Sequence, residues 1–451
     1  MSAAVTAEQT ALDFLSGLIE RARAAGAGAV DAVLIDSTSL SVSQRLGKRE
    51  DLEHSESGDF GLRVLVGRRQ AVVSSSDRGD KSVAELVERA VAMARAAPED
   101  PHCGLADPEW LCADPPALDL ADTGEPSAGT LYDRAAAAED AARAVEGITN
   151  SEGAQASWGR STVGLATSGG FAGAYTGTRY GLAASVLAGV GRGMERDYDW
   201  VSVRHESDLE DPAALGRRAG ERAVARLNPK KVSTAQVPVL YDPRISNGLV
   251  RSLSGAVSGS SVARGTSFLK DKMGERIFAP GISVIDDPHR ARGLSSRPFD
   301  GEGVTTKRLA VIEEGVLMTW FLDRATGHQL GLPSTGHAAR GTSAPPSPSS
   351  SNLYLEAGSQ SRADMIAGID AGFYVTELMG MGVNPVTGDY SRGASGFWID
   401  KGEIAYPVSE LTIAGNLKDM FLNLTPADDL EFRYGVNAPT LRIDGMTVAG
   451  A

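Results

Sequence analysis

Histidine and cysteine are the residue types most often used to hold a metal ion, and this 451-residue chain has six of the first and two of the second. Two histidines four residues apart on one helix face present both imidazoles to a single ion, but no pair in this sequence has that spacing. His205 is followed by Glu206 with no second histidine behind it, and Cys103 and Cys112 have no second cysteine pair to complete a site. The spacing of these residues predicts no metal site.

Serine is the next residue type that could do chemistry. Residues 252–267 read SLSGAVSGSSVARGTS, which offers many hydroxyls, but the sequence identifies no base beside them. A run of this composition is also typical of turns and close packing. The glycine-rich stretches lack the Lys-Ser/Thr ending of a phosphate-binding loop and the spacing of a dinucleotide fingerprint. A serine nucleophile in this run stays open as an alternative, and nucleotide binding has no support.

The densest polar and glycine-rich cluster is GMGVNPVTGDYSRGASG, residues 380–396. Glycines on both sides would let another backbone approach closely, and polar side chains between them could hydrogen-bond to it. The same residue types are also common in ordinary turns. We predict a substrate-binding or partner-binding role for five residues of this cluster, Asn384, Thr387, Asp389, Ser391 and Arg392.

Helices are expected mainly in the first half of the chain. Capping-box patterns at Thr6 and Ser82, each followed by apolar residues at three- and four-residue spacing, predict helices that end at Gly26 and Pro98. Three further helices are predicted over residues 130–147, 211–227 and 242–256. The second and third of them begin with an Asp-Pro pair, which suits the cap and first turn of a helix.

Strands and turns fill most of the remainder. β-Branched and alternating residues predict strands at residues 30–42, 60–66, 70–74 and within 164–190. Hairpins are predicted around Glu314-Gly315 and around Lys401-Gly402. The proline-rich segment that contains Pro345, Pro346 and Pro348 cannot be a central strand, and is either a mobile loop or an extended cover over another surface.

The pattern changes near residue 230, where Asn228-Pro229 precedes a strand-like segment. We therefore predict an α+β protein of two domains. Residues 1–230 would form a mixed α/β N-terminal domain, and residues 231–451 a β-rich, mainly antiparallel C-terminal domain.

The composition narrows the classes of function. The chain has 44 Lys and Arg against 58 Asp and Glu, a formal charge of −14, which argues against a nucleic-acid-binding surface over the whole protein. No run of about 18 apolar residues is present to span a membrane, and the N-terminal segment has no basic region typical of a secretion signal. We expect a cytoplasmic protein that binds neither nucleic acid nor membrane directly.

Three stretches of the second half are similar to a known family. RSLSGAVSGSSVARGTSFLKDKMGERIF (residues 251–278), DGEGVTTKRLAVIEEGVLMTWFLD (300–323) and MGMGVNPVTGDYSRGASGFWIDKGEIAYPVSELTIAGNL (379–417) resemble the TldD/PmbA family, also called modulator of DNA gyrase. The resemblance extends in order and length over nearly the whole chain. It implies an α/β N-terminal domain followed by a β-rich C-terminal domain.

The resemblance also implies an activity. In this family a TldD-type subunit and a TldE/PmbA-type subunit form a heterodimeric zinc metalloprotease that acts on unfolded peptides, and only the TldD type carries the zinc motif His-Glu-x-x-x-His. At the corresponding place this chain reads Arg251-Ser252-Leu253-Ser254-Gly255-Ala256. The family's cysteine ligand near the C-terminus is also missing, since residues 429–450 contain no cysteine.

The resemblance therefore implies a TldE/PmbA-type subunit with no catalytic and no metal-ligating residue of its own. Zinc is expected in a TldD-type partner, and this chain is expected to help enclose and bind the unfolded peptide. Two alternatives from other classes stay open. One is a self-sufficient hydrolase with a non-metal nucleophile, and the other is a non-enzymatic binding protein that modulates DNA gyrase.

Overall fold

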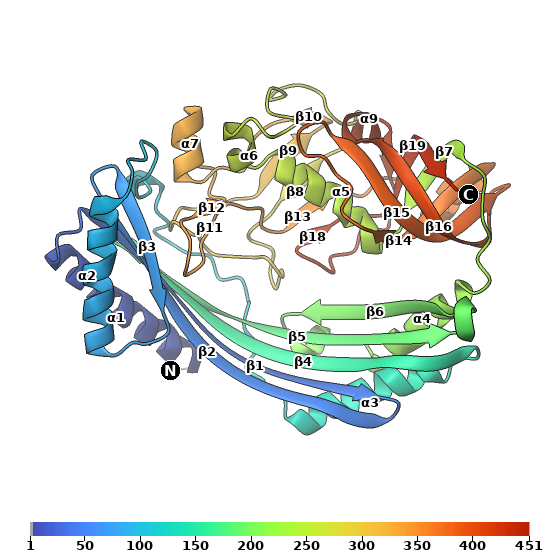
Figure 1. The fold of residues 1–451 in the computed structure, drawn as a ribbon, viewed down its shortest axis with the longest axis horizontal. Helices are drawn as coiled ribbons and strands as arrows, with labels where there is room; N and C mark the ends of the chain where they lie inside the picture. Colours follow the sequence, from blue (N-terminus) through green and yellow to red (C-terminus); the bar gives the residue numbers. More distant parts are fainter. Residues whose placement is uncertain (1–2, 451) are drawn as a thin grey trace.

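The computed structural model describes residues 3–450. Figure 1 shows a long curved sheet formed by the N-terminal half of the chain, with the C-terminal half facing its concave side. We call residues 3–227 the N-terminal region and residues 235–450 the C-terminal region. No helix among the described residues is both long and apolar enough to cross a membrane.

The N-terminal sheet has six strands in the order β3-β2-β1-β4-β5-β6, each antiparallel to its neighbours. Four of the strands have 17 to 20 residues, far more than the five or so that are typical. Right-handed twist accumulates along such strands, and the sheet is strongly curved (Figure 1). Its strands are β1 (Ala29–Arg45), β2 (Lys48–Val66), β3 (Arg69–Ser75), β4 (Ile148–Thr167), β5 (Ala172–Ala188) and β6 (Glu195–Val203).

Four helices cover this sheet in two pairs. Helices α1 (Ala3–Ala24) and α2 (Asp80–Ala96) bury their apolar faces on one half of it, where Leu15, Phe60 and Val87 share one hydrophobic cluster. Helices α3 (Ala128–Arg143) and α4 (Pro212–Ala225) pack on the other half. These two helices cross closely, because a Cβ on Gly216 would lie 1.9 Å from the carbonyl oxygen of Ala138.

The C-terminal region contains two larger sheets with a shared hydrophobic core. In the first, of order β16-β15-β14-β7-β19-β17, only the pair β7–β14 is parallel. Its strands are β7 (Ala235–Tyr241), β14 (Ala371–Met379), β15 (Asp389–Asp400), β16 (Glu403–Asn416), β17 (Leu424–Pro426) and β19 (Leu441–Ala449).

The second sheet, of order β10-β9-β8-β13-β18, has shorter strands and a parallel pair β13–β18. Its strands are β8 (Val284–Asp286), β9 (Leu309–Glu313), β10 (Val316–Leu317), β13 (Leu353–Leu355) and β18 (Val436–Asn437), and a separate pair is formed by β11 (Ala338–Ala339) and β12 (Ser347–Pro348). The helices of this region are α5 (Pro243–Ala256), α6 (Gly259–Ala263), α7 (Arg324–Leu330), α8 (Arg362–Ala367) and α9 (Leu417–Leu422).

The predicted α+β class is confirmed, and so are the two C-terminal hairpins. The turn at Glu314 and Gly315 connects β9 to β10, and the turn at Lys401 and Gly402 connects β15 to β16. All four turn residues have positive φ, which is the backbone geometry that tight hairpin turns require.

Both predicted capping boxes are wrong. Helix α1 already begins at Ala3, so Thr6 lies inside it. Helix α2 begins at Asp80 after Gly79, and Ser82 instead donates to Asp77 Oδ2 from within the first turn. Serine and threonine are tolerated in a first turn as well as at a cap, so the pattern placed each start a few residues late.

The proline-rich segment is an extended cover over the N-terminal sheet. Its two ends pair with each other as β11 and β12, and between them Arg340 donates to Asp31 of β1 at 2.8 Å. Thr342 lies so close to β2 that a Cβ on Gly61 would be 2.1 Å from its carbonyl oxygen. Glycine at position 61 is therefore what allows this segment to lie against the strand.

Candidate functional site

Helix α5 occupies the place where the resemblance puts the family's zinc motif. Asp242 accepts a hydrogen bond from the Arg244 N–H, and Pro243 follows in the first turn, so the predicted cap is confirmed. Leu249 and Leu253 fill the core of the C-terminal region. The burial of these leucines leaves the opposite face of the helix free for other groups.

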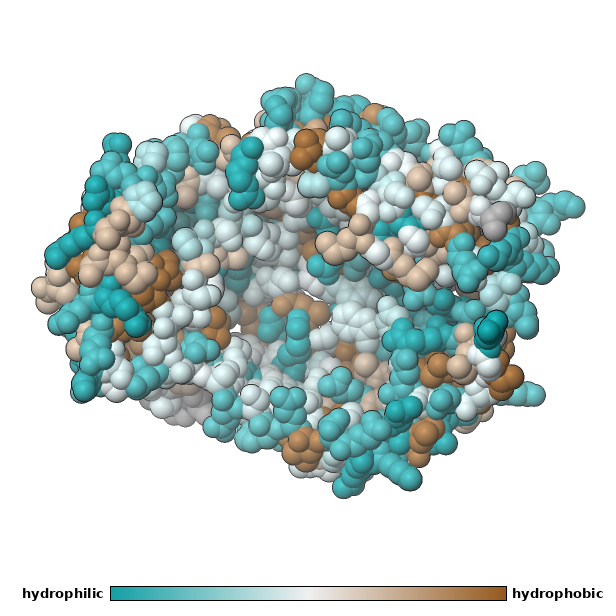
Figure 2. Space-filling view, viewed as in Figure 1, coloured by the Kyte–Doolittle hydropathy of each residue, from teal (hydrophilic) through white to brown (hydrophobic). Residues whose placement is uncertain are grey.

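That opposite face, which we call the open face of α5, carries Gly248, Arg251, Ser254 and Gly255. Nothing lies within 4 Å of the position that a Cβ would take on either glycine. Ser254 donates to the hydroxyl of Ser350 at 3.3 Å. Figure 1 shows α5 on the side of the C-terminal region that faces the N-terminal sheet, and Figure 2 shows the molecule hollowed between these two regions.

The donor set of α5 does not fit a zinc ion. Zinc is held by thiolate, imidazole and carboxylate groups, whereas residues 251–256 supply a guanidinium, two hydroxyls, a glycine and two apolar side chains. Among residues 3–450, no three His, Cys, Asp or Glu side chains gather closely enough to hold a metal ion. Residues 251–256 therefore do not form a zinc site.

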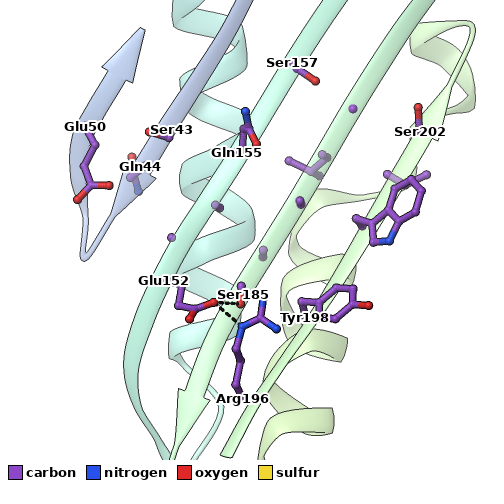
Figure 3. Close-up of a pocket in the computed structure, with 18 of the residues that line it drawn as sticks. Ser43, Gln44, Glu50, Glu152, Gln155, Ser157, Ser185, Arg196, Tyr198 and Ser202 are labelled. Carbon is purple, nitrogen blue, oxygen red and sulfur yellow. Dashed lines mark hydrogen bonds and ion pairs between the residues drawn. The ribbon is translucent and has the colours of Figure 1, made fainter. Parts of the chain in front are cut away.

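A cavity of about 700 Å³ lies on the concave face of the N-terminal sheet. Its lining comes mainly from β4, β5 and β6, with a few residues of β1 and β2. Helices α3 and α4 lie behind the sheet in Figure 3. Glycine and alanine residues of β4 and β5 form the base of the cavity, and their small side chains leave space above the sheet. The polar and aromatic lining residues are Ser43, Gln44, Glu50, Glu152, Gln155, Ser157, Arg179, Ser185, Arg196, Tyr198, Trp200 and Ser202.

Inside this cavity a fixed charge pair stands beside aromatic surface. Glu152 accepts hydrogen bonds from Arg196 and from Ser185, and these bonds lower the pKa of the Glu152 carboxyl. Tyr198 and Trp200 come from the edge strand β6. The Ser185 hydroxyl is bonded to a carboxylate, but because Arg196 pairs with Glu152 and the pKa of Glu152 is lowered, this carboxylate is a weak base. The lining therefore suits binding rather than covalent chemistry.

The outer edge of β6 is closed by side chains. The N–H groups of Tyr198 and Trp200 donate to Asp197 and Asp199, at 2.8 and 2.9 Å. Their carbonyl oxygens accept from arginines of the C-terminal region, Tyr198 from Arg244 at 3.3 Å and Trp200 from Arg433 at 3.0 Å. Because these main-chain groups are occupied, this part of β6 cannot accept another strand.

The same aspartates fix the position of α5 over the sheet. Arg244, in the first turn of α5, forms an ion pair of 2.8 Å with Asp197. Asp199 is surrounded by Arg218, Arg222 and Arg433. Burial by itself would raise the pKa of Asp199, but the three guanidinium groups outweigh it, and the pKa is lowered. The period-two alternation in RDYDWVSV, with Asp on one side and aromatic rings on the other, is the sequence signal for this arrangement that we missed.

The structure places the five predicted binding residues at the tip of the β14–β15 hairpin and the start of β15. The side chains there bond mainly to one another: Asn384 Oδ1 accepts from the Thr387 N–H, and Thr387 Oγ1 donates to Asp389 at 2.6 Å. Arg392 Nε donates to the Met379 carbonyl at 3.4 Å, and Ser391 is exposed. None of the five lines the concave-face cavity, and their binding role stays a prediction.

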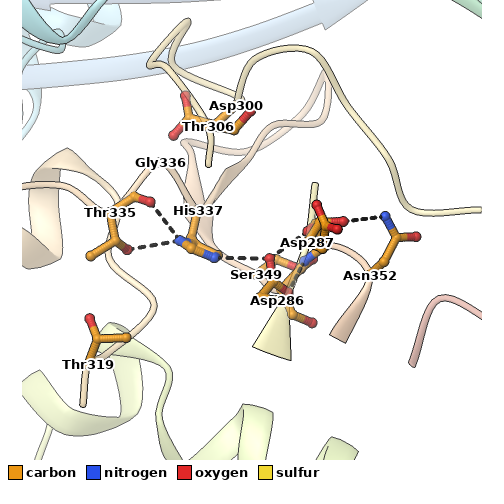
Figure 4. Close-up of polar contacts among 12 residues, drawn as sticks. Asp286, Asp287, Asp300, Thr306, Thr319, Thr335, Gly336, His337, Ser349 and Asn352 are labelled. Carbon is orange, nitrogen blue, oxygen red and sulfur yellow. Dashed lines mark hydrogen bonds and ion pairs between the residues drawn. The ribbon is translucent and has the colours of Figure 1, made fainter. Parts of the chain in front are cut away.

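His337 belongs to a closed polar network shown in Figure 4. Its Nε2 lies 3.2 Å from Asp286 Oδ2, and its Nδ1 lies 2.8 Å from the Thr335 carbonyl oxygen. Ser351 donates to the same oxygen of Asp286. Burial would raise the pKa of Asp286, but contact with His337 and Ser351 outweighs it and lowers the pKa. The His337 ring and the Asp286 carboxylate are both buried, so this network stabilises the fold.

The serines of residues 252–267 are bonded as structural groups. Ser252 donates to the Gly248 carbonyl at 2.9 Å, and Ser267 to the Ala256 carbonyl at 2.6 Å. In the part of the chain that the structure describes, none of these serines hydrogen-bonds to a histidine. A hydroxyl activated for attack needs such a base, so this geometry gives the alternative of a serine hydrolase no support.

Comparison with known proteins gives the same family along the whole chain. Residues 30–94 match the PmbA/TldA metallopeptidase domain 1, residues 121–227 the central domain and residues 234–450 the C-terminal domain. The chain is 38% identical over 446 residues to the metalloprotease PmbA of Escherichia coli O157:H7, covering 98% of this chain and 95% of that protein. It is 37% identical over 445 residues to a metalloprotease PmbA homolog of Haemophilus influenzae, covering 98% and 97%.

Solved structures have the same fold. A putative modulator of DNA gyrase from Bacteroides thetaiotaomicron has a TM-score of 0.89 at 27% identity, covering 97% of this chain and 98% of that one. TldE from Thermococcus kodakarensis has a TM-score of 0.87 at 21% identity, covering 97% and 100%. The chain belongs to the PmbA/TldD family of metalloproteases.

Proposed function

We propose that this chain is the TldE/PmbA-type subunit of a heterodimeric zinc metalloprotease and contributes no ligand to the zinc ion. The observation that carries this proposal is the open face of α5. The helix lies on the side of the C-terminal region that faces the N-terminal sheet, yet its exposed and half-buried positions carry Arg251, Ser254 and Gly255 where a zinc peptidase would present histidine and glutamate.

In this proposal a TldD-type partner would hold the zinc ion, which would supply Lewis-acid activation of the peptide carbonyl and of a water molecule there. This chain binds and encloses the substrate. Its concave-face cavity offers Gln155 and Ser157 as hydrogen-bonding groups and Trp200 as an aromatic surface. Such groups can hold an extended backbone with little regard to its side chains, which suits an unfolded peptide.

The test is association measured with purified proteins. The TldD-type protein of the same organism and this chain should sediment together as a 1:1 complex, and an unfolded peptide labelled with a fluorophore should bind the complex more tightly than either subunit. An obligate complex of this kind buries on the order of 2,000 Å² or more. Two subunits that sediment separately at micromolar concentration would contradict the proposal.

A further inference from the structure

A smaller cavity, of about 270 Å³, continues the concave-face cavity at the C-terminal end of β6. Ser202 lines both cavities. The Tyr434 ring of the smaller cavity packs against the Trp200 ring of the larger one, with ring centres 4.8 Å apart. We call the smaller cavity the arginine pocket, because three of the residues that line it are Arg204, Arg290 and Arg292.

Arg204 carries a charge that no carboxylate among the described residues balances. It is half-buried and continues the alternation of β6 on the concave face. Gly177 of β5 makes room for it, because a Cβ there would lie 2.7 Å from Arg204 Nη1. The guanidinium donates to three main-chain carbonyl oxygens, at 2.8 to 3.3 Å. Burial, and then the charge of Arg179, lower the pKa of Arg204, which is the direction expected for a cation without an anionic partner.

Two further arginines beside Arg204 have free hydrogen-bond donors. Arg179 is exposed on β5 and lines the concave-face cavity, and Arg290 is half-buried in the arginine pocket. Neither guanidinium forms an ion pair or donates a hydrogen bond within residues 3–450. Arg290 lies on the Phe432 ring, 3.4 Å from its centre. This contact uses the flat face of the guanidinium and leaves the N–H groups at its edge free to bind an anion.

The carboxylates at the arginine pocket are already engaged. Asp208 is the one carboxylate among the described lining residues, and its two oxygens accept from Arg292 at 3.0 and 3.1 Å. Arg292 also pairs with Asp119, at 2.6 Å. The charge of Arg292 is therefore neutralised, whereas the charges of Arg204 and Arg290 are not.

The acidic groups of the concave-face cavity lie away from this end. Glu152 is engaged by Arg196 and Ser185, and Figure 3 shows it and Glu50 apart from Ser202, the residue that both cavities share. The whole chain has a formal charge of −14, so three neighbouring arginines without carboxylate partners stand out from the average surface. An extended peptide on the concave face would meet a local positive potential at this end.

We propose that the arginine pocket binds a carboxylate of the peptide that lies on the concave face. Arg179 and Arg290 donate hydrogen bonds to this carboxylate, and the charge of Arg204 attracts it. A peptide carries such a group at its C-terminus and on Asp and Glu side chains. The proposal rests on the peptide-binding role proposed above for the concave face, and it adds a preference for peptides with an acidic group at this end.

Fluorescence anisotropy on the full chain alone tests this proposal with a short unfolded peptide that carries an uncharged dye at its N-terminus. The peptide is used as the free C-terminal acid, as the C-terminal amide, and as the amide with one glutamine replaced by glutamate. At low salt the acid should bind about tenfold more tightly than the amide, and added salt should reduce this difference. The third form identifies the source of the carboxylate. If it binds as the acid does, a side chain suffices, and if it binds as the amide does, the C-terminus is required.

The variants Arg179→Gln and Arg290→Gln should each lower the ratio of acid affinity to amide affinity, and the double variant should lower it further. Neither arginine has a polar partner to lose, so both variants should stay folded. Arg204 is left unchanged, because its bonds to three carbonyl oxygens also hold the fold. Arg192→Gln is the matched control. Arg192 is exposed in the turn at the opposite end of β5 and β6, and its loss should keep the ratio unchanged.

Equal binding of all three peptide forms would overturn the proposal, and this comparison needs no variant. An equal fall of the ratio in Arg192→Gln and Arg179→Gln would also overturn it. Amide binding should depend on Trp200 and not on Phe432, whose ring contacts Arg290. If the amide binds in this way and the acid binds no better, the peptide-binding role stands and only the arginine pocket is overturned. If no form binds the chain, this proposal fails, while the sedimentation experiment still decides the subunit role.

Discussion

Arg244 Nη1 lies 2.8 Å from Asp197 Oδ1, which ties the first turn of helix α5 to the edge strand of the N-terminal sheet. The two side chains are only 11% and 4% exposed. Arg244 also donates to the carbonyl oxygen of Tyr198. This ion pair thus helps to hold the start of α5 against the edge strand of the sheet whose concave face carries the cavity that we assign to substrate binding.

Replacing Arg244 with glutamine should destabilise the protein. Removing one partner of a buried ion pair costs up to about 3–5 kcal/mol, and Arg226 Nη1, 3.6 Å from Asp197 Oδ2, offsets part of the charge left behind, so a loss near the lower end of this range is expected. Urea unfolding of the variant should show a loss of this size, and Arg217→Gln, an exposed arginine on α4, should change stability by less than about 0.5 kcal/mol. Equal stability of Arg244→Gln and the wild type would mean that the pair does not hold the regions together.

Glu302 should make stability fall as pH rises. Burial, and then the nearby Asp300, raise the pKa of Glu302 to about 8, above the value of about 4.3 in an unfolded chain. Between these values the folded state binds a proton that the unfolded state does not, so the free energy of unfolding decreases by up to about 1.4 kcal/mol per pH unit. Glu302→Gln mimics the protonated form, so unfolding measured at pH 5.5 and 7.5 should show a smaller decrease in the variant. A parallel decrease in both proteins would contradict this.

Trp200→Ala should weaken binding of an unfolded peptide without unfolding the chain. The ring lines the concave-face cavity and is only partly buried, and an aromatic anchor typically contributes more than 1 kcal/mol to binding. Fluorescence anisotropy with a labelled peptide measures the change. Phe432→Ala, which removes an aromatic ring that is 41% exposed and lies outside this cavity, is the control. Similar losses of peptide affinity in the two variants would contradict the proposal that the concave-face cavity binds the peptide.

Gly61→Ala should detach the proline-rich segment from strand β2. The added methyl group would meet the Thr342 carbonyl oxygen at 2.1 Å, and overpacking of this kind costs about 1–3 kcal/mol. Hydrogen exchange over residues 340–347 should become faster. Gly17→Ala is the matched control, because nothing lies within 4 Å of its Cβ position in helix α1, and it should stabilise the helix slightly. Unchanged exchange in Gly61→Ala would show that the segment is held by other contacts.

The triple variant Arg251→His, Ser252→Glu, Ala256→His should gain no zinc-dependent cleavage. Ala256 is 3% exposed and packs in the core, and residues 3–450 contain no cluster of three His, Cys, Asp or Glu side chains that could complete a zinc site. Peptide cleavage by the variant alone, with and without added zinc, is the measurement. Substantial activity that a chelator removes would contradict the account.

The sequence predicted those elements whose signals are local. The Asp-Pro starts of α4 and α5 were found because cap and first turn are adjacent residues, and the turn at Lys401 and Gly402 was found because a hairpin turn needs positive φ. The capping boxes at Thr6 and Ser82 failed because the same residues also fit inside a first turn.

The candidate site depends on contacts that are distant along the chain. Asp31 and Arg340 are 309 positions apart, and Asp197 meets Arg244 across the joint between the regions. No periodicity connects such positions, and sheet order and strand length follow from packing rather than from local propensity. The sequence therefore indicated the family and the missing ligands, while the two cavities required the structure.

The central claim is that this chain acts only with a zinc-bearing partner. The measurement is cleavage of an unfolded polypeptide by the purified chain alone, and by the chain co-expressed with the TldD-type protein of the same organism, each with and without chelator. We predict cleavage only in the co-expressed sample, abolished by the chelator. Cleavage by this chain alone that persists in chelator would contradict the account.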